Sequence, residues 1–207
     1  MNSRLRRLLR TALAATVCFH LFLTCGGGGA AVLIAILTGS SLPKGTIGIA
    51  YPSVTLQAGG GTAPYEWILL SGDTSGLTLS SAGVISGTPQ AAGVFTFHVR
   101  VTDARSRTAE KDFSLAVNGI LRVTVVGQGT VVSNPSGIGC PGDCEASYFP
   151  GTIVTLSPAP VAGWRFDGWS GDADCSNGQV TVDAVKSCTA TFSPIPPVQF
   201  TLTVSKS

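Results

Sequence analysis

The stretch VFTFHVRV, residues 94–101, decides the fold class of this sequence. Apolar and polar side chains alternate along it, and a period of two residues indicates a strand that buries one face. FSLAV (113–117) repeats the alternation, and glycine turn signals such as SAG (81–83) and AAG (91–93) separate the short runs. We therefore predict a mainly-β chain. The apolar face of the first strand comprises Phe95, Phe97, Val99 and Val101, and its polar face comprises Thr96, His98 and Arg100.

The charge of the sequence excludes one class of partner. Only 12% of the 207 residues are charged, with 13 Lys and Arg against 11 Asp and Glu. Four arginines lie within the first ten residues, so the rest of the chain carries 9 basic and 11 acidic residues, a net charge of −2. Binding to nucleic-acid phosphates needs a basic surface. We expect no nucleic-acid partner.

Residues 1–24 have the composition of an export signal. MNSRLRRLLR is basic, and TALAATVCFHLFLT (11–24) is apolar but shorter than the roughly 20 residues that cross a bilayer. We predict a helical signal peptide over 1–24. An alternative joins this run to AAVLIAIL (30–37) as one membrane helix, although the four intervening glycines would weaken it.

LFLTC (21–25) resembles the lipobox of bacterial lipoproteins, in which the cysteine becomes the first residue and carries a diacylglyceryl group. The resemblance implies lipidation of Cys25, a tether over 25–35 and a location in the cell envelope, facing the periplasm or the exterior. The membrane is then a partner through the lipid. Phe22 and Thr24 depart from the usual lipobox residues. A secreted protein released by plain cleavage, and an uncleaved anchor, are the alternatives.

Residues 36–118 resemble the bacterial "putative Ig" family, a cadherin-like β-sandwich of exported proteins. The resemblance is carried by LPKGTIGIAY (42–51), GGTAPYEW (60–67), GLTLSSAGVISGTP (76–89) and AGVFTFHVRVTD (92–103). It implies an Ig-like sandwich and an extracellular setting, and it implies no reaction.

Residues 119–193 resemble the divergent repeats related to the internalin B-repeat, with a small β-grasp-like fold. The resemblance is carried by VTVVGQGTVVSNP (123–135), GTIVTLSPAPVAGWRFDGWSG (151–171) and CTATF (188–192). Over 194–207 we expect a Pro-rich linker and the first strand of a truncated further repeat, because FTLTV (200–204) is similar to LRVTV (121–125).

Four cysteines fall in this second segment: Cys140, Cys144, Cys175 and Cys188. Zinc is one explanation, but the C-x3-C and C-x12-C spacings lack the usual close pairs and no histidine lies nearby. Thiols pair in the oxidising surroundings of an exported chain. Local proximity and the family resemblance together favour disulfides between the first two and between the last two cysteines. A domain of this size gains from such cross-links.

The sequence shows no catalytic or cofactor motif that we accept. Gly137-x-Gly139-x-x-Gly142 matches a dinucleotide fingerprint, but no helix is expected after it. His98 is expected on the polar face of a strand, with no orienting acid in sight. Asp103 and Asp172-x-Asp174 are weak candidates for calcium, and bonds to their own turns are the favoured explanation. We expect no enzyme activity, no metal site and no cofactor.

The aromatic cluster Trp164, Phe166 and Trp169 has two interpretations. Exposed together, these rings would stack on sugars or on a partner. Packed inward, they would supply the core of a small domain, and we favour that interpretation. Trp67 is likewise expected in the sandwich core.

We therefore predict a non-catalytic, exported, surface-anchored protein with a structural, adhesion or interaction role. Its expected partners are the membrane and an extracellular protein or glycan. The alternatives are a carbohydrate-binding accessory module that uses the aromatic cluster, and the remnant of a larger exported multidomain protein.

Overall fold

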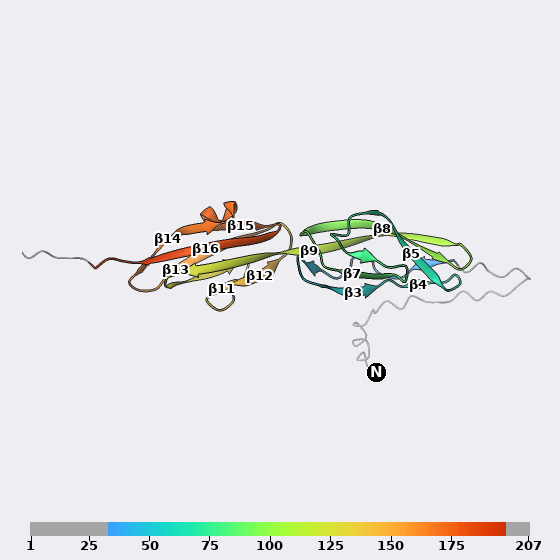
Figure 1. Cartoon of the computed structure of the whole chain (residues 1–207), viewed down its shortest axis with the longest axis horizontal. Helices are drawn as coiled ribbons and strands as arrows, with labels where there is room; N and C mark the ends of the chain where they lie inside the picture. The colour runs from blue at the N-terminus through green and yellow to red at the C-terminus, as the bar shows by residue number, and fades with distance from the viewer. Residues whose placement is uncertain (1–32, 198–207) are drawn as a thin grey trace, which may run out of the picture. The chain divides into compact units, whose positions relative to one another are not determined.

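The computed structural model describes residues 33–197 and contains two successive β domains (Figure 1). The predicted leader helix, Cys25, most of the tether and residues 198–207 lie outside the described residues. Among residues 33–197, no helix is long and apolar enough to cross a membrane. The mainly-β fold class is confirmed. The strands of the first domain are β1 (Ala35–Ile36), β2 (Gly45–Thr46), β3 (Tyr51–Thr55), β4 (Ala58–Gly59), β5 (Tyr65–Gly72), β6 (Thr78–Leu79), β7 (Val84–Gly87), β8 (Gly93–Asp103) and β9 (Thr108–Val126).

The first domain buries its core between two sheets. Strands β5, β8 and β9 form one sheet, with β2 beside β9, and β3, β7 and β6 form the other. The alternation in 94–101 lies in β8 as predicted, with Phe97, Val99 and Val101 buried and Phe95 partly buried against the same core. Trp67 is 4% exposed and belongs to this core, as expected.

The expected tether over 25–35 extends too far along the chain. Ile34 is buried in the core of the first domain, and Ala35 pairs with Gly59 in the short ladder between β1 and β4. The Ig-like domain therefore already includes Ile34, because an apolar side chain followed by a paired strand gains more from packing than from solvation.

The second domain consists of two facing sheets. Its elements are β10 (Gly129–Asn134), β11 (Gly139–Cys140), β12 (Glu145–Tyr148), β13 (Thr152–Pro160), β14 (Trp164–Gly171), the 3-10 helix η1 (Ala173–Asn177), β15 (Gln179–Val182) and β16 (Val185–Pro194). One sheet has the order β11-β10-β13-β15, and we call it the β10/β13 sheet. The other, the β9/β16 sheet, contains β14, β16, β9 and β12.

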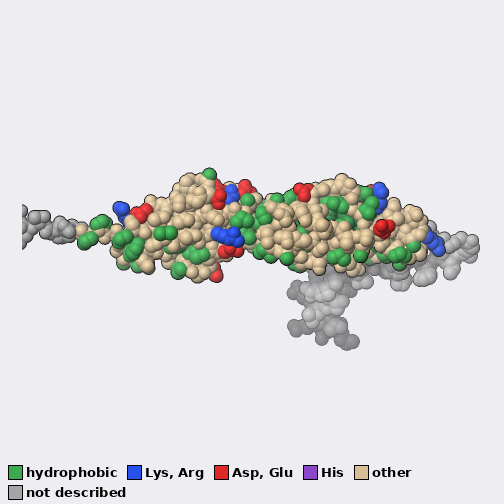
Figure 2. Space-filling view, in the orientation of Figure 1, with side chains coloured by type: hydrophobic (Ala, Val, Ile, Leu, Met, Phe, Trp, Pro, Cys, Tyr) green, Lys and Arg blue, Asp and Glu red, His purple; other side chains and the backbone are tan. Residues whose placement is uncertain are grey.

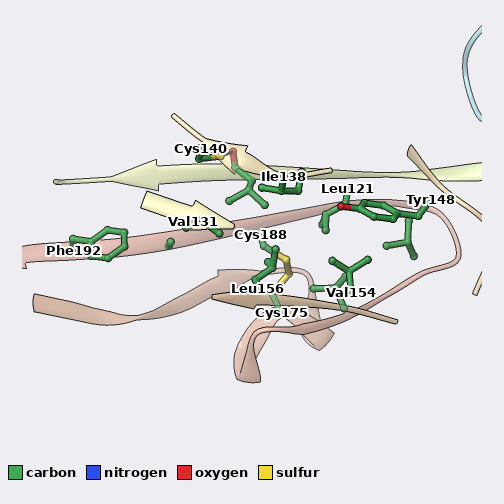
Figure 3. Packing of buried hydrophobic residues seen from close by; sticks show 14 residues of the cluster. Leu121, Val131, Ile138, Cys140, Tyr148, Val154, Leu156, Cys175, Cys188 and Phe192 are labelled. Atoms are coloured by element: carbon green, nitrogen blue, oxygen red, sulfur yellow. Dashed lines mark hydrogen bonds between the residues drawn. A yellow bond between two sulfur atoms is a disulfide. The ribbon is translucent and has the colours of Figure 1, made fainter. Parts of the chain in front are cut away.

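The core of the second domain lies between these sheets. Figure 3 shows Leu121, Val131, Val154 and Leu156 close to the Cys175–Cys188 disulfide, and all belong to one buried cluster. The β-grasp-like expectation is corrected here, because a β-grasp fold packs its sheet against an α-helix. Within the described part of the chain the helical content is η1, which has only 5 residues. The second sheet takes the place of the helix.

Strand β9 runs through both domains. Residues 108–117 pair with β8, and residues 120–126 pair in parallel with β16. The expected boundary between residues 118 and 119 therefore falls inside one strand. Gly119 suits this crossing, because a Cβ built there would lie 2.7 Å from the carbonyl oxygen of Ala184 and 2.8 Å from Val182 Cγ1.

We predict that loss of the Cys175–Cys188 bond weakens only the second domain. The double substitution Cys175→Ser/Cys188→Ser should cost about 3 kcal/mol of stability, because the bond closes a loop with a sequence separation of 13 residues and so lowers the entropy of the unfolded chain. Hydrogen exchange measures this: the amides of Val180 and Val182 should exchange faster, and those of Val99 and Val101 should not change.

The matched control is Cys140→Ser/Cys144→Ser, which opens a shorter loop and should cost less. Equal acceleration of exchange in both domains would contradict the assignment of the disulfides to one independent core.

Candidate functional site

A charged row crosses the outer face of the β8–β9 hairpin. The ladder register sets His98 opposite Asp112 and Arg100 opposite Glu110. His98 Nδ1 lies 2.6 Å from Asp112 Oδ1, and His98 Nε2 lies 3.0 Å from Glu110 Oε2. Arg100 donates to Glu110 Oε1 at 2.7 Å. The expectation that His98 has no orienting acid was wrong, because Asp112 and Glu110 lie beside it on the neighbouring strand.

The two carboxylates favour the imidazolium form of His98. Hydrogen bonds to Glu110 and then to Asp112 raise the pKa of His98. Reciprocally, the bond from His98, followed by the bond from Arg100, lowers the pKa of Glu110. With one carboxylate at each ring nitrogen, both nitrogens can donate only when the ring is protonated. The row therefore acts as a cross-strand ionic tie, and its exposure to solvent limits its strength.

A serine, a histidine and an aspartate line one hollow beside this row. The hollow measures about 420 Å³ and includes Ser71, His98 and Asp112 in its lining. Ser71 is the cross-strand neighbour of His98 on the other side. However, His98 Nε2 faces Glu110 rather than the serine hydroxyl. The bond between nucleophile and base that a Ser-His-Asp triad requires is thus replaced by an ion pair.

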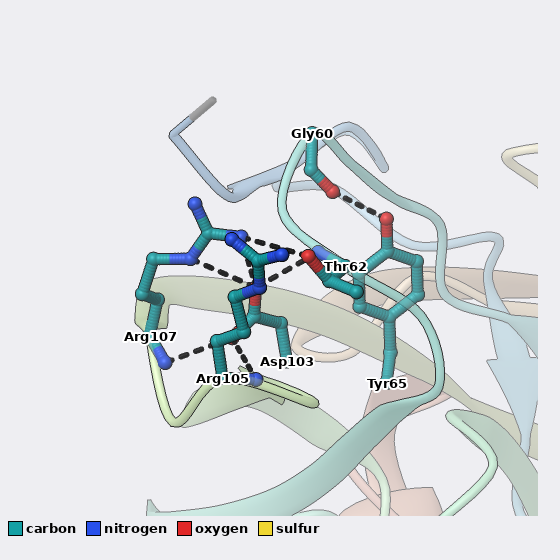
Figure 4. Close-up of polar contacts among 6 residues, drawn as sticks. All are labelled: Gly60, Thr62, Tyr65, Asp103, Arg105 and Arg107. Atoms are coloured by element: carbon teal, nitrogen blue, oxygen red, sulfur yellow. Dashed lines mark hydrogen bonds and ion pairs between the residues drawn. The ribbon is translucent and has the colours of Figure 1, made fainter. Parts of the chain in front are cut away.

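Asp103 organises the turn between β8 and β9 (Figure 4). It is 4% exposed. Its carboxylate accepts from the backbone N–H of Thr62 at 2.8 Å and from those of Arg105 and Arg107 at 2.9 Å each. The Arg107 guanidinium donates to Asp103 Oδ2 at 2.6 Å and also to Thr62 Oγ1 at 3.2 Å. Tyr65 closes the neighbouring loop by donating to the carbonyl of Gly60.

This network sets the charge of Asp103. Burial alone would raise the pKa of its carboxyl, but the bonds from the Arg107 side chain and the backbone outweigh burial and hold the pKa far below its usual range. All the groups that contact the Asp103 carboxylate are N–H donors. A calcium ion, which needs oxygen ligands, could bind there only if it displaced the Arg107 guanidinium. The carboxylate serves as an internal acceptor for the turn.

The other calcium candidates are also used within the fold. Asp172 Oδ2 accepts from the Ser187 N–H at 2.6 Å, and Asp174 Oδ2 accepts from the Thr181 N–H at 3.1 Å. Lys186 Nζ lies 3.4 Å from Asp174 Oδ2. Within residues 33–197, no group of three His, Cys, Asp or Glu side chains is arranged to hold a metal. Asp172 and Asp174 therefore bond backbone N–H groups of β16 and β15, and the expectation that they bond their own turn was wrong.

The aromatic cluster packs inward. Trp164, Phe166 and Trp169 are partly buried and contact the core of the second domain. The Phe166 ring centroid lies 5.4 Å from that of Trp169 and 5.4 Å from that of Phe192. These contacts support the core interpretation for Phe166 and Trp169, because two rings packed at a steep angle to each other do not offer one flat surface.

The cysteines pair as the sequence and the resemblance indicated. Cys140, on β11, is bonded to Cys144, just before β12, and Cys175, in η1, is bonded to Cys188, on β16. The Cys140–Cys144 bond lies between the two facing sheets. The Cys175–Cys188 bond connects η1, the segment between the sheets, to β16. The glycines at 137, 139 and 142 lie around β11, and the element that follows them is strand β12. The nucleotide-binding motif thus lacks its helix.

Comparisons with known families agree with the two resemblances. Residues 36–118 match the family described as "Putative Ig domain", and residues 121–196 match the "Divergent InlB B-repeat domain". The expected identity and order of the two modules are confirmed. No curated protein matches the chain.

Two solved structures have partial similarity. A "putative alpha-galactosidase" from Bacteroides fragilis is 17% identical with a TM-score of 0.35, over 45% of this chain and 20% of that one. The SGBP-B protein of the Bacteroides ovatus mixed-linkage glucan utilization locus, in complex with a mixed-linkage heptasaccharide, is 13% identical with a TM-score of 0.30, over 75% and 47% of the two chains. This chain thus spans less than half of either structure, and these TM-scores carry no functional argument.

We predict that the His98 tie stabilises the protein more in acid than in base. The folded-state pKa of His98 is raised above its unfolded value of about 6.5. Its contribution is therefore fully present below that value and is lost as the pH rises through the folded pKa. The difference in Tm between the wild type and His98→Gln should shrink as the pH rises. Titration of His98 by NMR at or below its unfolded pKa would contradict this.

Asp103→Asn should destabilise the first domain, because an amide presents a donor to the Thr62 N–H or to the Arg107 guanidinium. The pKa of Asp103 is lowered in the folded state. Its contribution to the free energy of unfolding is therefore present above about pH 4 and is lost as the pH falls through the folded pKa. In thermal unfolding, the wild type should lose its advantage over the variant as the pH falls below 4.

The control is Asp167→Asn, which removes a charge from the exposed pair with Arg165, whose side chain is 64% exposed. This change should lower the Tm much less. Equal losses in the two variants would show that burial of Asp103 has no special role.

Proposed function

We propose that this chain is an exported, non-catalytic structural and interaction module, held at the cell envelope through a lipid on Cys25. The observation that carries the proposal is the use of all four described cysteines in disulfides. Such bonds persist in oxidising compartments and are rare in the reducing cytosol. Cys140, Cys175 and Cys188 are each at most 3% exposed, which suits a structural role.

The placement of the polar groups supports a structural role. His98, Arg100 and Glu110 tie β8 to β9, and Asp103 ties the turn between them to Thr62. These side chains bond one another or the backbone within the fold, whereas a catalytic group must face substrate. The Ig-like and B-repeat modules fit surface interactions, and adhesion is the role that we infer for the anchored protein.

The intact mass of the chain purified from the membrane fraction tests this proposal. We expect a chain that begins at Cys25 with added acyl mass and gains four hydrogens on reduction, because two disulfides open. The Cys25→Ala variant should lose the acyl mass, and Cys18→Ala, the matched control in the apolar run, should keep it. A full-length chain, an unacylated chain or four free thiols would contradict the corresponding part of the proposal.

A further inference from the structure

Strand β1 and the residues that flank it carry an apolar outer stripe. Ile34 and Ile36 pack against the core of the first domain, whereas Leu33, Ala35 and Leu37 alternate with them and are exposed. Leu33 is 81% exposed and Leu37 is 64% exposed, the two highest values among the exposed large hydrophobic side chains of the described part of the chain. We call the three outward residues the leucine stripe. A single exposed leucine is ordinary, but a row on one face of one strand points to a contact.

The leucine stripe stands beside backbone that has no side chains. The register sets Ala35 opposite Gly59 of β4, and Gly60 and Gly61 follow. A Cβ built at Gly59 would lie 2.9 Å from Leu37 Cδ1, so the glycine leaves the space that the leucine occupies. The leucines therefore protrude beyond the backbone next to them.

Cationic side chains lie at the same end of the first domain. Lys111 Nζ donates to the Thr38 carbonyl at 2.5 Å, one residue beyond the stripe. Arg105 is exposed in the turn after β8. This turn is joined to the glycine loop, since the Ala104 N–H donates to the Thr62 carbonyl at 2.8 Å. Figure 2 shows basic side chains (blue) and hydrophobic ones (green) at the right-hand end of this domain.

Acidic side chains are sparse around the stripe. Residues 33–65 contain no Asp or Glu, and the next acid along the chain is Glu66 on β5. Asp103 is 4% exposed and is paired with Arg107. Lipid phosphates are negative and lie directly above the acyl chains. An apolar stripe bordered by cations therefore matches the chemistry of that boundary.

We propose that the leucine stripe docks on the phospholipid bilayer in which the chain is anchored. Leu33 and Leu37 enter the boundary between headgroups and acyl chains, and Lys111 and Arg105 face the headgroup phosphates. This inference rests on the proposed lipid anchor, and it adds to it a non-covalent contact between the first domain and the membrane.

The position of the stripe in the chain favours a membrane over a protein partner. Leu33 lies eight residues after Cys25. A fully extended chain spans at most about 3.6 Å per residue, so the stripe stays within roughly 29 Å of a lipid on Cys25. Such a tether raises the effective concentration of the bilayer surface, and a small contact then suffices. A protein partner has no comparable enforced proximity.

Co-sedimentation with vesicles tests the proposal without the acyl group. The mature chain, residues 25–207 with Cys25→Ser, should bind weakly and reversibly to vesicles of phosphatidylglycerol and phosphatidylcholine. Leu33→Ser/Leu37→Ser should lower the partition coefficient at least about tenfold, because two leucine side chains leave the apolar region. Arg105→Gln should lower it less, and only when the anionic lipid is present. Circular dichroism should show that these variants keep their fold.

The matched control is Ile49→Ser/Val94→Ser, which removes two side chains of the same domain that are 55% and 57% exposed. Val94 lies nine residues before Asp103 on β8, about 30 Å away. Ile49 lies near this far end, in the turn after β2. The control should bind vesicles like the wild type.

Absence of vesicle binding, unchanged binding of the leucine variant, or an equal loss in the control would overturn the proposal. So would leucine-dependent dimerisation without vesicle binding, because the stripe would then contact a second copy of the chain. The anchor is judged separately. Acyl mass on Cys25 without vesicle binding refutes only this inference, and vesicle binding without acyl mass refutes only the anchor.

Discussion

Strand β9 is the element on which the rest of the structure depends. Its 19 residues supply a central strand to each domain. The buried side keeps one parity throughout, from Phe113, Leu115 and Val117 in the first core to Leu121 and Val123 in the second. Because successive side chains of a strand point to opposite faces, a slip of one residue would expose both sets at once. The register of one strand thus fixes two cores.

The second domain compensates for its small size by closing the sides of its sandwich. The Cys140–Cys144 bond joins the edge strand β11 to the segment that begins β12, and these strands belong to different sheets. On the other side, the Cys175–Cys188 bond joins η1, which connects the two sheets, to β16. Asp172 reinforces this side through the Ser187 N–H. The two disulfides thus stabilise a small core at the sides of the sandwich, which the packing of the two sheets does not cover.

Local patterns in the sequence predicted local structure well. The alternation around Phe97 and Phe113 identified β8 and β9, and short cysteine spacings with the family resemblance identified the disulfides. Interactions between strands were harder to predict, because they depend on register. The partners of His98 lie 12 and 14 residues away. The two runs HVR and EKD, set on either side of the Asp103 turn, were the signal that could have revealed them.

The strand pairing around the domain limits also depends on tertiary contacts. Asn118-Gly119 looks like a turn in sequence, yet β9 continues through it, because pairing with β12 and β16 begins where pairing with β8 ends. Ile34 looks like the end of a tether until the core that covers it is known. In both cases tertiary pairing overrides a local preference for a break.

Many of the charged side chains in the described part of the chain form ion pairs between strands. On the first domain they form pairs across β8 and β9, where each ion pair also helps to specify the register. On the β9/β16 sheet they form pairs again, between β9 and β12 and near the bulge in β14. The β10/β13 sheet has its register fixed by the buried valines of β10, β13 and β15, so it needs no such pairs. Its strands can therefore be free of charge without loss of a defined register.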